Sequence, residues 1–154
     1  MDNFKQSKLL LSLALICLVL GLNKSALAYN IELKDLNGRN VQLSNYLGKP
    51  VILFFWTIRC PYCREELKNL NRLYPALDKE GIVVLGVNVG EPEYKVRRFF
   101  EGYPLNFKIL LDESGLLADR YNLLGVPTYV FLDKGGREIS QAHSFPVNYK
   151  SLLF

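Results

Sequence analysis

The pattern of hydrophobic and polar positions after residue 30 is dominated by two apolar runs separated by an amphipathic stretch. Residues 51–56 and 82–89 have the composition of strands that are buried on both faces of a sheet. Between them, apolar residues recur at spacings of three and four over residues 61–77, which predicts a helix with one buried face. Residues 93–101 repeat this pattern and predict a second helix.

Shorter segments complete the predicted architecture. Turn-forming residues 35–38 and 133–136 each separate two short strand-like segments, which predicts a β-hairpin near either end of the domain. The other predicted elements are strands at 31–33, 40–43, 107–110, 128–132 and 137–141, and short helices at 44–46, 116–121 and within 145–154. Because strands alternate with helical crossovers, we expect an α/β fold, with a central mixed β-sheet flanked by helices and an N-terminal β-hairpin.

The N-terminus has the pattern of an export signal. Lys5 and Lys8 precede an apolar run over residues 9–22, and small residues at 26–28 then offer a cleavage site before Tyr29. The run is shorter than the ~20 residues that a membrane-spanning helix needs. We therefore predict a signal peptide over residues 1–28 and a single domain over residues 29–154, with an uncleaved N-terminal anchor as the alternative. Either outcome places the domain outside the cytoplasm, in the periplasm or on the outer face of the cytoplasmic membrane.

Composition and charge indicate an ordinary globular domain. The 154 residues are 49% hydrophobic and 22% charged, with a net charge of +4. Without residues 1–28 the chain carries 16 basic and 14 acidic residues, so the balance of the domain is nearly neutral. This charge pattern offers no basic surface for nucleic acid.

Two of the three cysteines carry the candidate chemistry. Cys17 lies within the apolar N-terminal run, where it is interpreted as an apolar filler, while Cys60 and Cys63 form a Cys-x-x-Cys motif. The motif falls where the first buried strand passes into the first helix. The unpaired N–H groups and the dipole of the helix N-terminus stabilise a thiolate at Cys60. Cys63, one helical turn later, faces the same side and can attack a mixed disulfide formed at Cys60.

Other interpretations of the cysteine pair are weaker. A purely structural disulfide would close so short a loop that it would restrain little of the unfolded chain. A structural zinc site needs four ligands, and the two cysteines with the lone, distant His143 do not supply them. We therefore expect no metal, and His143 is interpreted as a surface residue.

Several motifs resemble those of a known family. Residues 55–66 resemble the active-site segment of thioredoxins, and residues 36–50 resemble the lead-in typical of the TlpA/ResA-like thiol–disulfide oxidoreductases. Residues 87–91 and 125–128 also match that family, so the resemblance extends over residues 31–142. It implies a thioredoxin-like fold of the AhpC/TSA–redoxin type, with Cys60 as nucleophile, Cys63 as resolving thiol and a Cys60–Cys63 disulfide in the oxidised form.

The resemblance also assigns roles around the cysteines. Pro127 matches the cis-proline that faces the cysteines in the family, and the backbone of Val126 would pair with substrate. Glu91 matches a glutamate that the ResA-like reductases place near the cysteines, which makes it a candidate proton acceptor. A solvated loop carboxylate at the start of the next helix is the alternative for Glu91.

The remaining expected substrate-binding residues are Trp56, Arg59, Pro61 and Tyr62. Arg59 departs from the family, which usually has tryptophan there, so the groove beside Cys60 should be more cationic. The dipeptide Pro61-Tyr62 is typical of glutaredoxins, which suggests a less reducing potential than that of thioredoxin.

The resemblance implies a protein disulfide reductase that uses dithiol–disulfide exchange and no cofactor. Its substrates would be protein thiols and disulfides, including those of an apocytochrome c, and a membrane protein would supply electrons to the monomeric domain. A disulfide oxidase or isomerase is the main alternative. A thiol peroxidase is less well supported, because Leu53 stands where peroxiredoxins have a proline. A non-catalytic binding module is the last alternative.

Overall fold

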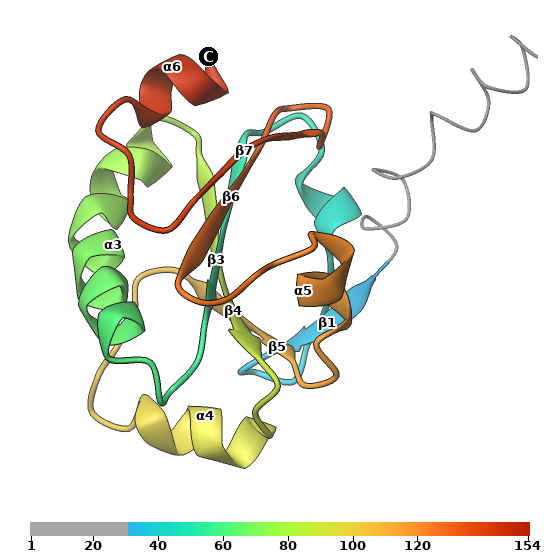
Figure 1. Cartoon of the computed structure of the whole chain (residues 1–154), viewed down its shortest axis with the longest axis vertical. Coiled ribbons are helices and arrows are strands. Elements are labelled where there is room, and N and C mark those ends of the chain that lie inside the picture. Colours follow the sequence, from blue (N-terminus) through green and yellow to red (C-terminus); the bar gives the residue numbers. More distant parts are fainter. Residues whose placement is uncertain (1–30) are drawn as a thin grey trace, which may run out of the picture.

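The computed structural model describes residues 31–154, so the predicted signal peptide or anchor lies outside the described residues. Within them, no helix is both long enough and apolar enough to cross a membrane. Seven strands form one sheet in the order β2-β1-β5-β4-β3-β6-β7 (Figure 1). The sheet is mixed and begins with an N-terminal hairpin, as predicted.

The elements follow the predicted order, and their ends differ by no more than two residues, apart from the last helix, which was predicted only to lie within residues 145–154. In chain order they are β1 (Glu32–Asp35), β2 (Asn40–Gln42), η1 (Leu43–Tyr46), β3 (Val51–Trp56), α3 (Pro61–Lys79), β4 (Val83–Val89), α4 (Glu93–Phe99), β5 (Lys108–Asp112), α5 (Leu116–Arg120), β6 (Thr128–Leu132), β7 (Glu138–Ala142) and α6 (Tyr149–Leu153). Helix α3 runs past residue 77 and ends before Gly81, whose φ of 75° a β-carbon would disfavour.

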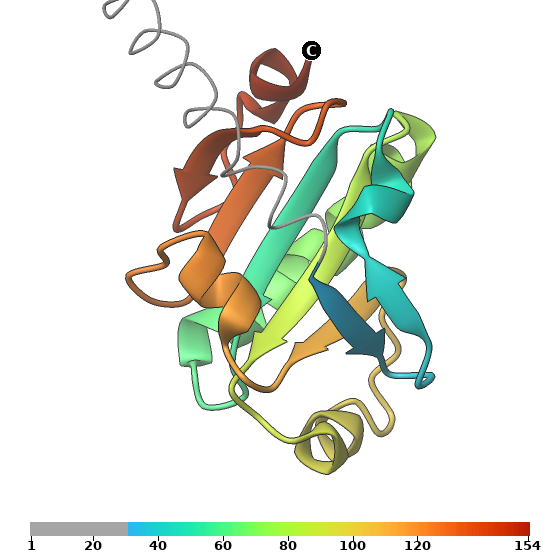
Figure 2. The ribbon, with the colours of Figure 1, turned by 90° about the vertical axis from the view of Figure 1, so that its right-hand side faces the viewer.

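The central strand β3 divides the apolar residues between two cores. Its six residues are all buried, and alternate side chains point to opposite faces of the sheet. Val51, Leu53 and Phe55 pack in the core beneath α5, whereas Ile52, Phe54 and Trp56 pack in the core beneath α3. Figure 2 shows α5 and α3 on opposite faces of the sheet. This double burial explains why β3 is a continuous apolar run.

Strand direction brings three separate loops to one end of the sheet. Because β4 runs parallel to β3, the last residues of the two strands are neighbours, with Trp56 opposite Asn88. Strand β6 runs antiparallel to β3, so it begins where β3 ends, with Thr128 opposite Phe55. The segments that follow β3 and β4 therefore meet the segment that precedes β6.

A buried carboxylate anchors α5, which leads into this last segment. The N-cap residue of the helix is Gly115, which has no side chain to cap it. Asp112, which is 0% exposed at the end of β5, instead accepts hydrogen bonds from the backbone N–H groups of Leu117 (3.2 Å) and Ala118 (2.9 Å). The carboxylate thus satisfies N–H groups that would otherwise be unpaired at the start of the helix.

We predict that Asp112→Ala lowers the free energy of unfolding by about 2–3 kcal/mol, because it leaves two N–H groups near the helix start without an acceptor. Urea unfolding followed by circular dichroism measures this change. The matched control is Asp119→Ala on the exposed side of α5, which should change the free energy by less than about 0.5 kcal/mol. Equal effects of the two substitutions would contradict the capping role of Asp112.

Candidate active site at the end of strand β3

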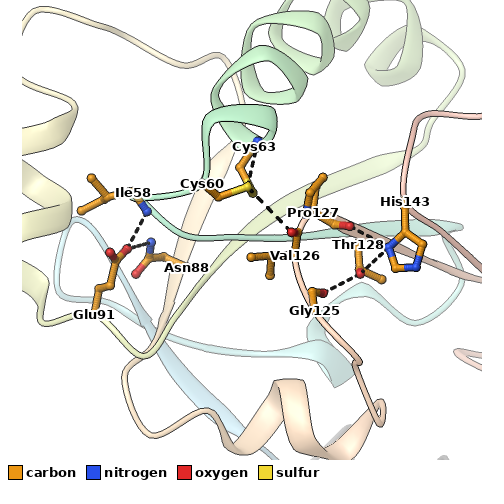
Figure 3. The surroundings of a disulfide bond; sticks show 10 residues. All are labelled: Ile58, Cys60, Cys63, Asn88, Glu91, Gly125, Val126, Pro127, Thr128 and His143. Carbon is orange, nitrogen blue, oxygen red and sulfur yellow. Dashed lines mark hydrogen bonds between the residues drawn. A yellow bond between two sulfur atoms is a disulfide. The ribbon is translucent and has the colours of Figure 1, made fainter.

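The two cysteines of the Cys-x-x-Cys motif lie at the N-terminus of α3 and form a disulfide (Figure 3). Cys60 is the N-cap residue, and its sulfur accepts a hydrogen bond from the backbone N–H of Cys63 at 3.1 Å. Cys60 is partly exposed, whereas Cys63 is 0% exposed. A disulfide-bearing substrate can therefore reach Cys60 but not Cys63.

The local sequence explains why the helix begins at this point. Pro61 occupies the first turn, where its missing N–H removes no helical hydrogen bond. The N–H of Cys63 and the positive end of the helix dipole then point at Cys60 Sγ, where they stabilise negative charge. Cys60 is thus suited to act as a nucleophile and as a leaving group.

The loop before β6 packs against the cysteine pair from one side. The Val126–Pro127 peptide bond is cis, and the Val126 carbonyl oxygen lies 3.8 Å from Cys60 Sγ. This loop forms one wall of an open groove of about 530 Å³ that continues past Tyr62 and Leu124. Val126 and Pro127 accordingly lie where a segment that approaches Cys60 would contact them.

Glu91 lies on the other side of the cysteines from Pro127 (Figure 3). Its Oε2 accepts hydrogen bonds from the backbone N–H of Ile58 (2.9 Å) and from Nδ2 of Asn88 (2.7 Å). The carboxylate is half-buried and ties the segment before Cys60 to the end of β4. It is therefore not simply a solvated loop residue, and its hydrogen bonds run to these two neighbours rather than to a cysteine.

Asn88 is a site residue that the sequence reasoning missed. It is a fully buried polar residue at the end of β4, and its Oδ1 has no hydrogen-bond partner among the described residues. The sequence does contain an indication of its role, because Asn88 is the one polar side chain in an otherwise apolar strand. A buried amide usually has a specific hydrogen-bond partner. Here that partner is Glu91.

His143 is exposed, as expected, but it is also bonded to the loop before β6. Its Nδ1 lies 2.9 Å from the carbonyl oxygen of Pro127 and 3.2 Å from Oγ1 of Thr128. A carbonyl oxygen only accepts, and the Thr128 hydroxyl donates to the Gly125 carbonyl at 2.7 Å. Nδ1 must therefore carry a proton and donate it toward the Pro127 carbonyl oxygen. His143 links the end of β7 to the cis-proline loop, which no sequence motif indicated.

The expectation that Trp56 contacts substrate is wrong. Its side chain is 0% exposed, and its ring packs at 5.4 Å, centroid to centroid, from those of Phe99 and Phe100. The reason is the alternation in β3, which points Trp56 into the core beneath α3. Trp56 thus belongs to the core on which the N-terminus of α3 packs. The other three expected residues, Arg59, Pro61 and Tyr62, are exposed around the cysteines.

A second carboxylate, that of Glu66 on α3, is held by a buried tyrosine. Glu66 Oε2 accepts a hydrogen bond of 2.6 Å from the hydroxyl of Tyr129, which is fully buried. Burial raises the pKa of Tyr129, and the hydrogen bond and negative charge of Glu66 raise it further, so the hydroxyl stays protonated and donates. This bond fixes Glu66 at the wall of the 530 Å³ groove.

The site offers no cluster of metal ligands. Within residues 31–154, no group of three or more histidine, cysteine, aspartate or glutamate residues could hold a metal ion. The reactive groups of the arrangement are the two sulfur atoms, and the chemistry open to them is thiol–disulfide exchange.

Comparison with known proteins agrees with this geometry. The chain is 40% identical over 114 residues to the thiol–disulfide oxidoreductase ResA of Geobacillus kaustophilus, which covers 74% of this chain and 65% of that relative. The chain thus spans slightly less than two thirds of the length of that relative.

Solved structures show the same fold. A secreted disulfide oxidoreductase of Mycobacterium tuberculosis, described as homologous to E. coli DsbE, is 25% identical, with a TM-score of 0.68 over 80% of this chain and 93% of that chain. The exposed lipoprotein thioredoxin of Streptococcus pneumoniae is 27% identical, with a TM-score of 0.71 over 79% of this chain and 96% of that chain. The predicted thioredoxin-like fold is confirmed.

The family model named AhpC/TSA matches residues 25–138, which is most of the chain. With the thioredoxin-like fold and the cysteine pair at the start of α3, this match shows that the chain belongs to the AhpC/TSA family of the thioredoxin superfamily.

Proposed function

We propose that this protein is an exported thiol–disulfide oxidoreductase that reduces disulfides of protein substrates. The observation that carries the proposal is the pairing of a partly exposed Cys60, capped by the Cys63 N–H, with a fully buried Cys63. One sulfur can meet a substrate and the other can only resolve the product. The similarity to a thiol–disulfide oxidoreductase supports the same activity.

The exchange takes place in two steps. In the reduced protein, the Cys60 thiolate attacks one sulfur of the substrate disulfide, the substrate S–S bond breaks, and the other substrate sulfur leaves as a thiolate. The Cys63 thiol then loses its proton and attacks Cys60 Sγ, which releases the second substrate thiolate and forms the Cys60–Cys63 disulfide. Two electrons pass from the protein dithiol to the substrate, and the disulfide form of the structure is the product.

The proposal also specifies where the protein acts and in which direction electrons flow. The signal-like N-terminus supports export, as does the similarity to a secreted disulfide oxidoreductase and to an exposed lipoprotein. A monomeric domain outside the cytoplasm would need a membrane protein to return it to the dithiol form. Apocytochrome c is the specific substrate that the resemblance to ResA-like reductases suggests.

We predict that Cys63→Ser accumulates a mixed disulfide between Cys60 and substrate, because no second thiol remains to release it. Non-reducing electrophoresis and mass spectrometry of the variant, expressed at its natural location, identify the bound proteins. The matched control is the double variant Cys60→Ser/Cys63→Ser, which should capture nothing. Capture through Cys63 in Cys60→Ser, rather than through Cys60, would contradict the assigned roles.

Glu91 is proposed as the proton acceptor for the resolving step, and Glu91→Gln tests it. Glutamine keeps an oxygen for the N–H of Ile58 but is not a base, so we expect release of the mixed disulfide to slow by about 10- to 100-fold. Stopped-flow measurement with a preformed mixed disulfide follows this step, and thermal unfolding checks the fold. A wild-type release rate in Glu91→Gln would leave Glu91 only a structural link.

The reduction potential decides between reductase and oxidase. We expect the Cys60–Cys63 couple to lie at or below about −200 mV, within the range from thioredoxin to glutaredoxin. Equilibration with glutathione buffers, read by the fraction of protein disulfide, gives the value. A potential near the ~−120 mV of a strong oxidant would instead support the disulfide oxidase.

A further inference from the structure

A second hollow adjoins the cysteine pair on the side away from Pro127. It has a volume of about 590 Å³ and lies between the segment Ile58–Arg59 and the first turns of α4. Its charged lining residues are Arg59, Lys95, Arg98 and Glu91. Since Arg59 directly precedes Cys60, any segment that reaches the nucleophile from this side passes over the hollow.

The three basic side chains of the hollow are not neutralised by any acidic residue among residues 31–154. Arg59, Lys95 and Arg98 are all exposed, and none of them takes part in the ion pairs formed among residues 31–154. By contrast, Arg97, which lies in α4 with Lys95 and Arg98, forms an ion pair with Glu93 at 2.6 Å and does not line the hollow. The hollow is therefore lined by the two basic residues of α4 that form no ion pair within the described part of the chain.

The one carboxylate in the hollow is already occupied. Glu91 Oε2 accepts from both Ile58 N–H and Asn88 Nδ2, so its charge is directed toward the protein. Three cations thus face one internally bonded anion, and the hollow has an excess of positive charge. Such an excess in a concave site attracts negative groups and raises the rate of their encounter.

The opposite side of the cysteine pair has a different character. The groove beyond Pro127 presents Tyr62, which is 78% exposed, and Leu124, which is 98% exposed, together with Glu65 and Glu66. None of the three basic residues of α4 lines that groove. A substrate that crosses Cys60 therefore meets positive charge on one side, and apolar surface with negative charge on the other.

From this asymmetry we infer that Arg59, Lys95 and Arg98 form a docking surface for acidic residues that flank the reactive disulfide of a protein substrate. This inference rests on the proposed function, because it names the class of substrate for the same site. The proposed occupant of this surface is an acidic segment of the substrate chain, held beside Cys60 while exchange takes place. The charge complementarity acts on encounter with the substrate and leaves the chemistry of exchange unchanged.

Paired peptides test the inference. Two peptides of equal length each carry one internal disulfide, with either glutamates or lysines next to the cysteines. The reduced wild-type protein should reduce the glutamate peptide about tenfold faster at low ionic strength. This ratio should fall toward one in about 0.5 M NaCl, since salt screens exposed charges.

Charge-reversal and neutral variants locate the effect. In Lys95→Glu/Arg98→Glu the ratio of the two rates should fall below one, and in Lys95→Gln/Arg98→Gln it should approach one. The ratio is the readout because any change in the reactivity of Cys60 affects both peptides equally. The matched control is Lys49→Glu/Lys134→Glu, which changes the net charge equally at the far end of β3 and should keep the wild-type ratio.

The outcomes are distinct. A wild-type ratio of one, or a ratio that the α4 variants leave unchanged, would overturn the docking surface while the exchange activity stands. Bis(2-hydroxyethyl) disulfide, which carries no charge, reports that activity separately. If the wild-type protein reduced neither peptide nor this small disulfide, the proposed function would fail, and the docking inference with it.

Discussion

The antiparallel pairing of β6 with β3 is the constraint on which the site depends. It places Thr128 opposite Phe55, so the cis-proline loop must lie where β3 releases the chain toward the cysteines. The register of this pairing is fixed because β3 and β6 are buried along their whole lengths. A shift by one residue would turn every side chain of β3 to the other core. The packing of the sheet thereby fixes the distance between Val126 and Cys60.

Hydrogen bonds then hold the loops that this packing brings to the cysteine pair. On one side of the cysteines, Glu91 joins the segment before Cys60 to Asn88 at the end of β4. On the other side, His143 and Thr128 bond to the cis-proline loop and to each other. Both networks lie at the carboxyl ends of the parallel strands, where loops rather than strand neighbours must satisfy the polar groups. The cysteine pair is held between two anchored loops.

The site is chemically asymmetric because its two walls come from different elements. Helix α4 supplies Lys95 and Arg98, which form no ion pair among the described residues, whereas α3 and the cis-proline loop supply exposed apolar residues and carboxylates. The two sulfur atoms carry the electrons of disulfide exchange, so the basic and apolar residues of the walls are free to select substrates without altering which bonds form and break. This separation allows one fold to combine a common chemistry with different partners.

The order of the elements and the cysteine pair could be predicted from the residues, because both follow local rules, whereas the thioredoxin-like fold was predicted from the resemblance to a family. The apolar run of β3, the helical spacing in α3 and the position of Cys60 before Pro61 are patterns of neighbouring residues. The resemblance to a family added Pro127 and Glu91, which lie far along the chain from the cysteines. Their proximity follows from the topology of the sheet rather than from any local pattern.

The sequence by itself thus determined the order of the elements, the redox pair and the segments that flank it. Only the tertiary structure decided that Trp56 is buried, that Asn88 bonds Glu91, and that His143 reaches the cis-proline loop. It also decided that Arg59 shares a hollow with Lys95 and Arg98. These facts depend on which face of a strand or helix meets which neighbour, and long-range packing, not local propensity, sets that choice.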